Sequence, residues 1–262
     1  MKRTLSIIIL LVSTFGFATE QIPDILIWKN DTISLHSNPL GSYSKLDDLI
    51  LFGDKDAGYS TACWRGYIAE WKIIDNKLYL SNIYSCDYFY SENKTKADLK
   101  KLFPKKYNNG IVLANWYSGK LSVPNGKLIN KELKIYESEW LLRIKKGQVI
   151  NEKQFDNSSC HISIYTKNQD SLNHFITTNI NWNKIPRLEK GIHKVYGLIK
   201  SGKSKTEFSL EIKSRTEYKE LEKEALRILK LLPEFDFYIK AGEVINVKYT
   251  IPIMFNENNR PK

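Results

Sequence analysis

The sequence lacks a hydrophobic run long enough to cross a membrane as a helix. The apolar segment from Leu5 to Ala18 would extend roughly 21 Å as a helix, whereas the hydrocarbon core of a bilayer is roughly 30 Å thick. No cysteine follows this segment, which argues against a lipoprotein, and the eight prolines are scattered rather than gathered in a spacer. These absences disfavour a chain that is anchored in a membrane.

The sequence also lacks a long run of charges of one sign, although its formal net charge is +11. Lysine and arginine are interleaved with aspartate and glutamate along the whole chain. This pattern is typical of a solvated surface with mild attraction to anionic partners. No basic patch indicates a lipid or polysaccharide headgroup, and nucleic acid is a poor candidate for the partner of an exported protein.

The N-terminus predicts export through a signal peptide, residues 1–18. Lys2 and Arg3 precede the apolar segment, and the small residues Gly16 and Ala18 suit a cleavage site after Ala18. The alternative is an uncleaved membrane anchor, for which the segment is short. We therefore expect the mature chain in the periplasm or the cell envelope.

Signals of catalysis are missing as well. The four histidines have no metal-ligand spacing, and there is no nucleophile elbow, phosphate loop or HExxH motif. Cys160 and His161 are adjacent, but on a strand their side chains would point to opposite faces and could not meet. We predict no enzyme, no catalytic residues, no metal and no other cofactor.

The three cysteines permit one disulfide in an oxidising compartment and leave one cysteine over. A hairpin turn at Ile74–Lys77 would place Cys63 opposite Tyr88 and Cys86 opposite Arg65, so that the two cysteines are diagonal neighbours. A bulge that shifts the register would bring them within bridging distance. The alternative is two small buried residues.

The region before Pro186–Gly191 is predicted as a β-rich domain, residues 19–186. Alternating apolar residues and turn signals predict an opening hairpin, with strands at residues 25–28 and 33–35 around a turn at residues 29–31. Further strands are predicted at residues 64–74, 78–90, 111–116, 120–123, 133–144 and 149–155. Two short helices are expected, at Thr95–Phe103 and at Ser171–Ile180, with Asp170 as the N-cap of the second. The breaker residues of Pro186–Gly191 predict a linker.

Aromatic residues are concentrated in this first region, which holds all six tryptophans. Tyr84, Tyr88 and Tyr90 would share one face of a strand, because residues two apart point the same way. Such a face stacks on sugar rings in some proteins and fills a sheet core in others. The core interpretation is favoured, and glycan binding is kept as an alternative.

The C-terminal region has a sharper pattern. Strands are predicted at residues 194–200 and 206–213, followed by a helix whose apolar residues run from Leu221 to Leu232 at helical spacing. Pro233 ends the helix, and Val244–Phe255 alternates as a last strand. We therefore predict an α+β fold, in which a small ββαβ domain, residues 191–256, follows the β-rich one.

Two sequence blocks of this domain resemble a known family. Lys223–Pro233 is similar to the helix and helix end of TonB C-terminal domains, and Gly242–Phe255 resembles their closing strand, including its Thr-Ile-Pro-Ile-x-Phe ending. The resemblance implies a periplasmic module that binds outer-membrane transporters by adding a strand of the partner to its own sheet edge. It further implies that this edge comprises Asn246, Val247, Lys248, Tyr249, Thr250 and Ile251.

The chain also departs from that family. An aromatic residue and a Pro-Gly step usually follow the helix, whereas this chain has Glu234–Lys240 there, with Phe235 in the place of the aromatic and no Pro-Gly step. The Pro-rich spacer of energy transducers is also missing. We therefore expect a soluble protein that binds an outer-membrane β-barrel transporter or another envelope protein, linked to transmembrane transport. The alternative is that the β-rich domain binds a glycan or a protein while the C-terminal module docks it. Homo-oligomer formation stays open.

Overall fold

The computed structural model describes most of the chain, namely residues 21–53, 60–90, 92, 94–214 and 216–261. The predicted signal peptide, residues 1–18, lies outside these described residues. The described part is a mixed α+β structure that is rich in strands and has open sheets. This confirms the predicted α+β class.

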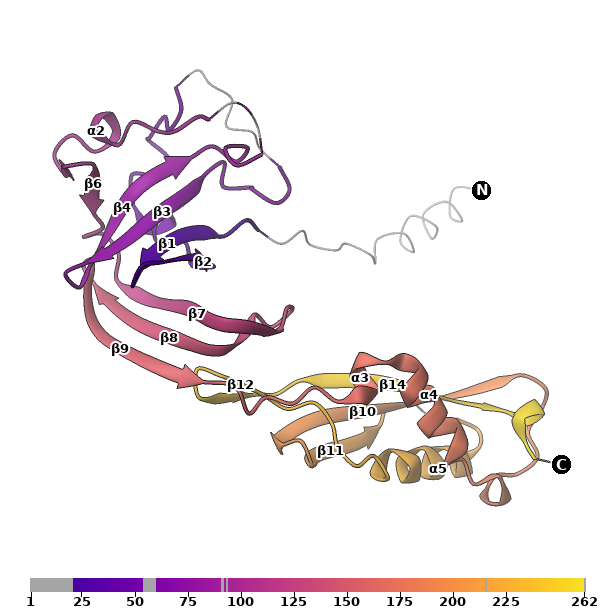
Figure 1. Ribbon diagram of the computed structural model, residues 1–262. Coiled ribbons are helices and arrows are strands. Elements are labelled where there is room, and N and C mark those ends of the chain that lie inside the picture. The colour runs from indigo at the N-terminus through magenta and orange to yellow at the C-terminus, as the bar shows by residue number, and fades with distance from the viewer. Residues whose placement is uncertain (1–20, 54–59, 91, 93, 215, 262) are drawn as a thin grey trace, which may run out of the picture. The chain divides into compact units, whose positions relative to one another are not determined.

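The chain divides into two compact units, each of which is made of two segments (Figure 1). Unit 1 comprises Met1–Pro124 and Trp140–Lys153, and unit 2 comprises Asn125–Glu139 and Gln154–Lys262. The linker predicted at residues 186–191 lies inside unit 2. The division therefore differs from the boundary expected from the sequence.

A single open sheet supplies most of unit 1, with the strand order β2-β1-β3-β4-β9-β8-β7. Two further strands extend it, since β6 pairs with β4 and β5 pairs with β6. The strands are β1 (Asp24–Trp28), β2 (Asp31–Leu35), β3 (Ile68–Ile74), β4 (Lys77–Tyr84), β5 (Tyr107–Asn108), β6 (Ile111–Leu113), β7 (Gly119–Asn130), β8 (Ile135–Lys145) and β9 (Gln148–Asp156). The ends of β7 and β8 that adjoin their turn, and the last residues of β9, are counted with unit 2.

Two tight turns form where the sequence predicts them. Lys29 and Asn30 have φ angles of 51° and 67°, and Asp75 and Asn76 have φ angles of 48° and 57°. Positive φ at both central residues gives a turn whose twist matches that of the flanking strands, and Asn and Asp tolerate it. The β1–β2 and β3–β4 hairpins follow from these turns.

Other pairings in unit 1 are not those expected from neighbouring segments. β1 runs parallel to β3, with Leu26 opposite Trp71. The segment at residues 111–116 forms only β6, which pairs with β4 and β5 rather than with the following strand. The predicted helix at residues 95–103 is the short α2 (Leu99–Leu102), which Asp98 caps through bonds from two backbone N–H groups.

The core of unit 1 combines inward side chains of this sheet with buried residues outside it, such as Leu40, Leu99 and Phe103. Fully buried members include Leu26, Leu35, Trp71, Leu78, Leu80 and Leu121. Burial of each such side chain contributes about 1.5–3 kcal/mol relative to exposure. This core is separate from the apolar cluster of unit 2.

Unit 2 contains a three-stranded antiparallel sheet, in the order β11-β10-β14, on which a helix packs (Figure 1). The elements are α3 (Ile164–Lys167), α4 (Gln169–Thr178), β10 (Ile192–Ser204), β11 (Glu207–Ile212), α5 (Lys219–Lys230), β12 (Tyr238–Lys240), β13 (Glu243–Ile245) and β14 (Lys248–Asn256). Helix α5 buries its apolar face, including Leu221, Ala225 and Leu229, against β10 and β11. Among the described strands, β12 and β13 pair only with each other.

The segment predicted as a linker is bound into unit 2 by specific contacts. Leu188 is buried in the same cluster as α5, and its backbone N–H donates to Glu257. Arg260 donates to the backbone oxygens of Trp182 and Pro186 at 2.6 and 2.7 Å. Pro and Gly therefore mark a turn here rather than a domain boundary.

Just before this segment, the chain is helical although its isoleucines favour a strand. Ile164 begins α3, and Ser163 caps this helix by accepting from the N–H of Tyr165. The next helix, α4, is capped by Asn168 rather than by Asp170. Local capping by Ser and Asn therefore outweighs the strand tendency of the isoleucines.

Candidate functional site: a free strand edge

Four of the six predicted partner-binding residues, Lys248 to Ile251, lie on β14, whereas Asn246 and Val247 precede it. The side chains of β14 alternate between the core and the surface. Ile251, Ile253 and Phe255 are buried in the cluster beneath α5. Thr250, Pro252 and Met254 are exposed. One face of the strand is therefore fixed by burial, which also fixes its register.

β14 is an outermost strand of its sheet. It pairs with β10 from Lys200–Lys248 to Ile192–Asn256 in one unbroken register. Within the described part of the chain, no strand pairs with its other edge. An edge strand carries a row of unpaired N–H and C=O groups that can template an incoming strand.

The register shows which backbone groups face outward. Ser201 N–H donates to the carbonyl of Val247 at 3.0 Å, so this residue pair is a hydrogen-bonded one. Hydrogen-bonded pairs alternate with non-bonded pairs in an antiparallel ladder. The backbone groups of Lys248, Thr250, Pro252 and Met254 therefore point away from β10. Pro252 has no N–H, and this position is tolerated because its missing donor lies on the free edge.

The start of the predicted site needs a correction. The sequence predicts one strand from Val244 to Phe255, but the structure interrupts it at Asn246 and Val247, between β13 and β14. The cause is Ser201, whose hydroxyl accepts from Val247 N–H at 2.9 Å and donates to the carbonyl of Ile245. Because both backbone groups of Val247 are bound to Ser201, the free edge begins at Lys248.

A buried carboxylate, which the sequence did not single out, fixes the beginning of β14. Asp236 is 2% exposed and accepts from Tyr249 Oη at 2.7 Å and Tyr238 Oη at 2.9 Å. It also accepts from Ser163 N at 2.8 Å and Thr166 Oγ1 at 2.6 Å. The sequence feature that could have indicated this buried carboxylate is its position between Phe235 and Phe237.

The two tyrosines show the effect of this carboxylate on proton affinity. Burial and the negative charge of Asp236 raise the pKa of Tyr238 to about 12. Burial and the hydrogen bond to Asp236 raise the pKa of Tyr249 above its ordinary value. Both hydroxyls therefore stay protonated, and remain donors, at any physiological pH.

The outer face of the sheet beside the free edge is apolar and basic. Tyr196 and Met254 are 41% and 44% exposed, and Tyr196 lies opposite Pro252. Lys194 lies opposite Met254, and Lys200, which forms an ion pair with Glu211 at 3.7 Å, lies opposite Lys248. An added strand would place alternate side chains over this face, where apolar and acidic residues are complementary to it.

The cysteines of unit 1 form a disulfide between Cys63 and Cys86, with their Cα atoms 6.0 Å apart. They lie just beyond the β3–β4 hairpin, in which the register shifts at Glu70 and Trp71. The sequence favoured this pairing if such a shift occurred. The strands themselves are shorter than predicted, since β4 ends at Tyr84.

We expect the disulfide to stabilise unit 1 by about 3 kcal/mol, because it closes a loop of 23 residues. The double variant C63A/C86A should show this loss in urea unfolding followed by hydrogen exchange of unit 1. A reductant should lower the stability of the wild type and leave the variant unchanged. Equal stability of the oxidised wild type and the variant would contradict the expectation.

The aromatic strand face expected at Tyr84, Tyr88 and Tyr90, for which core packing was favoured over sugar stacking, does not form on β4. Tyr84 is buried, with its ring centroid 4.3 Å from that of Tyr88, whereas Tyr90 lies beyond the strand and is 81% exposed. The three tyrosines therefore do not share a strand face. The tryptophans are similarly divided, from Trp71, which is fully buried, to Trp64, which is 76% exposed.

Cys160 and His161 each have a partner of their own. Cys160 Sγ accepts from Ile239 N–H at 3.1 Å, and burial raises the pKa of this thiol. His161 Nε2 lies 2.9 Å from a carboxylate oxygen of Glu234. Across residues 21–261 as far as they are described, no three His, Cys, Asp or Glu residues are grouped to hold a metal ion.

No helix in the described part of the chain is both long and apolar enough to cross a membrane. Comparison with protein-family models, with curated proteins and with solved structures finds no match to this chain.

Proposed function

We propose that this chain is an exported, TonB-like protein whose unit 2 binds an extended segment of an envelope protein by strand addition to β14. The single observation that carries the proposal is the outer edge of β14, where the backbone groups of Lys248, Thr250 and Met254 point away from the sheet. Main-chain hydrogen bonds would supply the affinity. By resemblance, the partner is the plug segment of an outer-membrane transporter.

The order of elements in unit 2 supports this interpretation. Two antiparallel strands are followed by an amphipathic helix that packs on them and by a last strand on the sheet edge. TonB C-terminal domains, which residues 191–256 resemble in sequence, use their last strand in this way. The β12–β13 hairpin lies between the helix and the last strand. We propose binding alone and leave force transmission out, since the chain has no Pro-rich spacer.

The edge predicts where an incoming strand pairs. Lys248 and Thr250 offer an N–H and a C=O each, whereas Pro252 offers only a C=O. Pairing should therefore be strong over the first half of β14 and interrupted at Pro252. A partner segment with alternating apolar residues, flanked by acidic ones, matches the outer face beside the edge.

Two substitutions on this edge test the proposal in opposite directions. Thr250→Pro removes an outward N–H and should weaken binding at least about tenfold, because a lost hydrogen bond and the proline ring both oppose pairing. Pro252→Ala restores a donor and should strengthen binding about fivefold. Thr250→Ala keeps the N–H and serves as the matched control.

The measurement starts with the full chain, immobilised and exposed to detergent-solubilised outer-membrane proteins. Mass spectrometry identifies the proteins that the wild-type chain retains in larger amounts than the Thr250→Pro variant does. Synthetic peptides that correspond to extended segments of these proteins are then titrated calorimetrically. Circular dichroism verifies that each variant is folded. If Thr250→Pro binds these peptides as tightly as Thr250→Ala does, strand addition at β14 is wrong.

A further inference from the structure

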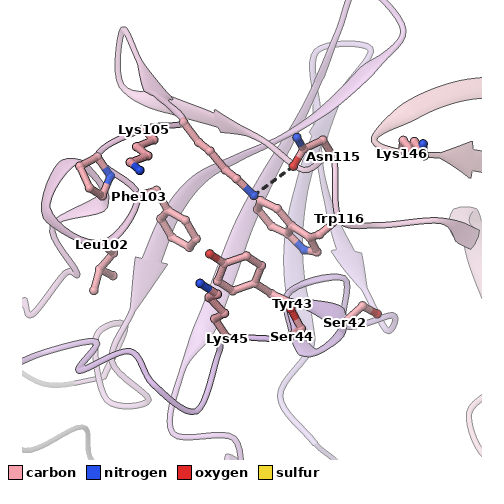
Figure 2. A pocket seen from close by; sticks show the side chains of 12 residues that line it. Ser42, Tyr43, Ser44, Lys45, Leu102, Phe103, Lys105, Asn115, Trp116 and Lys146 are labelled. Atoms are coloured by element: carbon pink, nitrogen blue, oxygen red, sulfur yellow. Dashed lines mark hydrogen bonds between the residues drawn. The ribbon is translucent and has the colours of Figure 1, made fainter.

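Unit 1 contains a cavity of about 930 Å³ that the sequence did not reveal. Four separate segments line it, as Figure 2 shows: the chain after the short helix at Leu40–Ser42, the end of α2, the residues after β6, and the β8–β9 turn. Binding cavities for small ligands typically have volumes of about 300–1,000 Å³. The cavity is therefore large enough for a small oligosaccharide or a molecule of similar size.

One wall of the cavity is aromatic. Tyr43 and Trp116, both half-buried, have ring centroids 5.0 Å apart, and Phe103 lies behind them, stacked on Trp116 at 5.8 Å with an interplanar angle of 7°. Trp116 is held in place because its indole N–H donates to the carbonyl of Pro39 at 3.1 Å. The rings therefore form a fixed platform rather than mobile surface side chains.

The rim of the cavity is basic. Lys45, Lys105, Lys106 and Lys146 line it, and its described lining residues include no acid. None of the four amines has an ion-pair partner among the residues that the structure describes. Their positive charge is therefore available to a ligand.

One side chain, Lys106, belongs to the basic rim and also contacts the aromatic wall. Lys106 Nζ donates to Asn115 Oδ1 at 3.1 Å, drawn as the dashed line in Figure 2, and lies 5.1 Å and 5.2 Å from the ring centroids of Tyr43 and Trp116. It is thus held above the aromatic wall, where a ligand packed on these rings would meet its charge. Ser44 and Asn115 add groups that hydrogen-bond hydroxyls.

We propose that this cavity binds an anionic saccharide, that is, sugar rings that carry carboxylate or phosphate groups. The C–H face of a sugar packs on aromatic rings, whose faces are electron-rich. The hydroxyls suit Ser44 and Asn115, and the acidic groups suit the lysines. This ligand site lies within unit 1 and is independent of the β14 edge, so the Thr250→Pro variant should bind the saccharide as the wild type does.

The experiment is calorimetric titration of the full chain at low and at physiological ionic strength. Tetragalacturonate and glucose 6-phosphate serve as the two anionic probes and distinguish uronate chains from sugar phosphates. Two controls separate these features. A neutral galactose tetrasaccharide has the sugar rings without the negative charge, and tetraglutamate has the negative charge without the sugar rings. We expect at least one anionic sugar to bind at least about tenfold more tightly than both controls, and binding to weaken as salt screens the lysines.

Matched variants locate the site. K105A/K146A removes two exposed charges and should weaken binding about fivefold, whereas K100A/K120A removes two exposed lysines elsewhere in unit 1 and should have no effect. Tyr43→Leu keeps an apolar side chain and should also weaken binding. The proposal is overturned if neither anionic sugar binds, if K105A/K146A binds as the wild type does, or if tetraglutamate binds equally well and Tyr43→Leu has no effect.

Discussion

Replacing Asp236 with alanine is expected to destabilise unit 2 by about 5 kcal/mol, which is comparable to the whole stability of many small domains. The carboxylate accepts four hydrogen bonds, from Ser163 N, Thr166 Oγ1, Tyr238 Oη and Tyr249 Oη. Each buried donor that loses its acceptor costs about 1–3 kcal/mol, and water that enters the vacated space recovers part of this. The effect is large because one side chain joins three segments.

Those three segments matter for the proposed edge. Asp236 connects the residues before α3 with β12 and with Tyr249 near the start of β14. Its loss should therefore loosen the part of β14 where pairing with a partner is expected to begin. Hydrogen exchange of the full chain should show faster exchange at Tyr249 and Ile251 than in the wild type.

Tyr249→Phe is the matched control, since it removes one of the four donors and keeps the ring. It should cost only about 1 kcal/mol. Urea unfolding, with hydrogen exchange to assign the transition to unit 2, measures both variants. If Asp236→Ala lowers the free energy of unfolding of unit 2 no more than Tyr249→Phe does, the carboxylate does not hold the three segments together as its contacts indicate.

Sequence reasoning succeeded where structure depends on neighbouring residues. The turns at Lys29–Asn30 and Asp75–Asn76 follow from residues that tolerate positive φ, and both hairpins were predicted. The helix around Leu221–Leu232 was visible from its apolar spacing and is α5. Local conformational preferences and periodicity are properties of a short segment, and a single sequence contains them.

It failed where structure depends on distant residues. The interruption before β14 comes from Ser201, 46 residues before Val247, and nothing in the strand pattern indicates it. The parallel pairing of β1 with β3 has the same origin, since Leu26 and Trp71 meet only in the fold. The last strand therefore begins later than the sequence predicts, and the first free residue of its outer edge is visible only in the structure.

The cavity of unit 1 is the extreme case of this limitation. Tyr43, Phe103, Trp116 and Lys146 come from four segments, and none of them is unusual within its own segment. Aromatic residues in a strand-rich region are expected in the core, and lysines on a basic chain are expected on the surface. These residues form a ligand site only when the fold brings the four segments together. A sequence pattern alone does not show which distant segments meet.

The second large effect is expected at Asp24, which is fully buried in unit 1. Its carboxylate lies 3.1 Å from Arg65 Nη1 and accepts from Ala69 N at 3.2 Å and Trp71 Nε1 at 3.0 Å. Asp24→Ala leaves the partly buried guanidinium of Arg65 without its counter-charge, although Arg65 still donates to the carbonyl of Ile22, and leaves two donors without an acceptor. The substitution should cost about 4 kcal/mol at pH 7. Asp31→Asn, on the exposed part of β2, is the control and should be near neutral.

The pH dependence of this effect has a definite sign. Burial raises the pKa of Asp24 to about 6 from an ordinary 3.8, although Arg65 opposes the rise. Between these values the folded chain retains a proton that the unfolded chain has released. Asp24 therefore contributes stability below about pH 4 that is lost as the pH rises to about 6, by about 3 kcal/mol in total.

Other carboxyl groups change stability in both proteins alike, so the difference in stability between the wild type and Asp24→Ala isolates this contribution. Urea unfolding at several pH values should show a difference that shrinks from pH 4 to pH 6 and is constant above. A difference that grows over this range would mean that the ion pair with Arg65 outweighs burial.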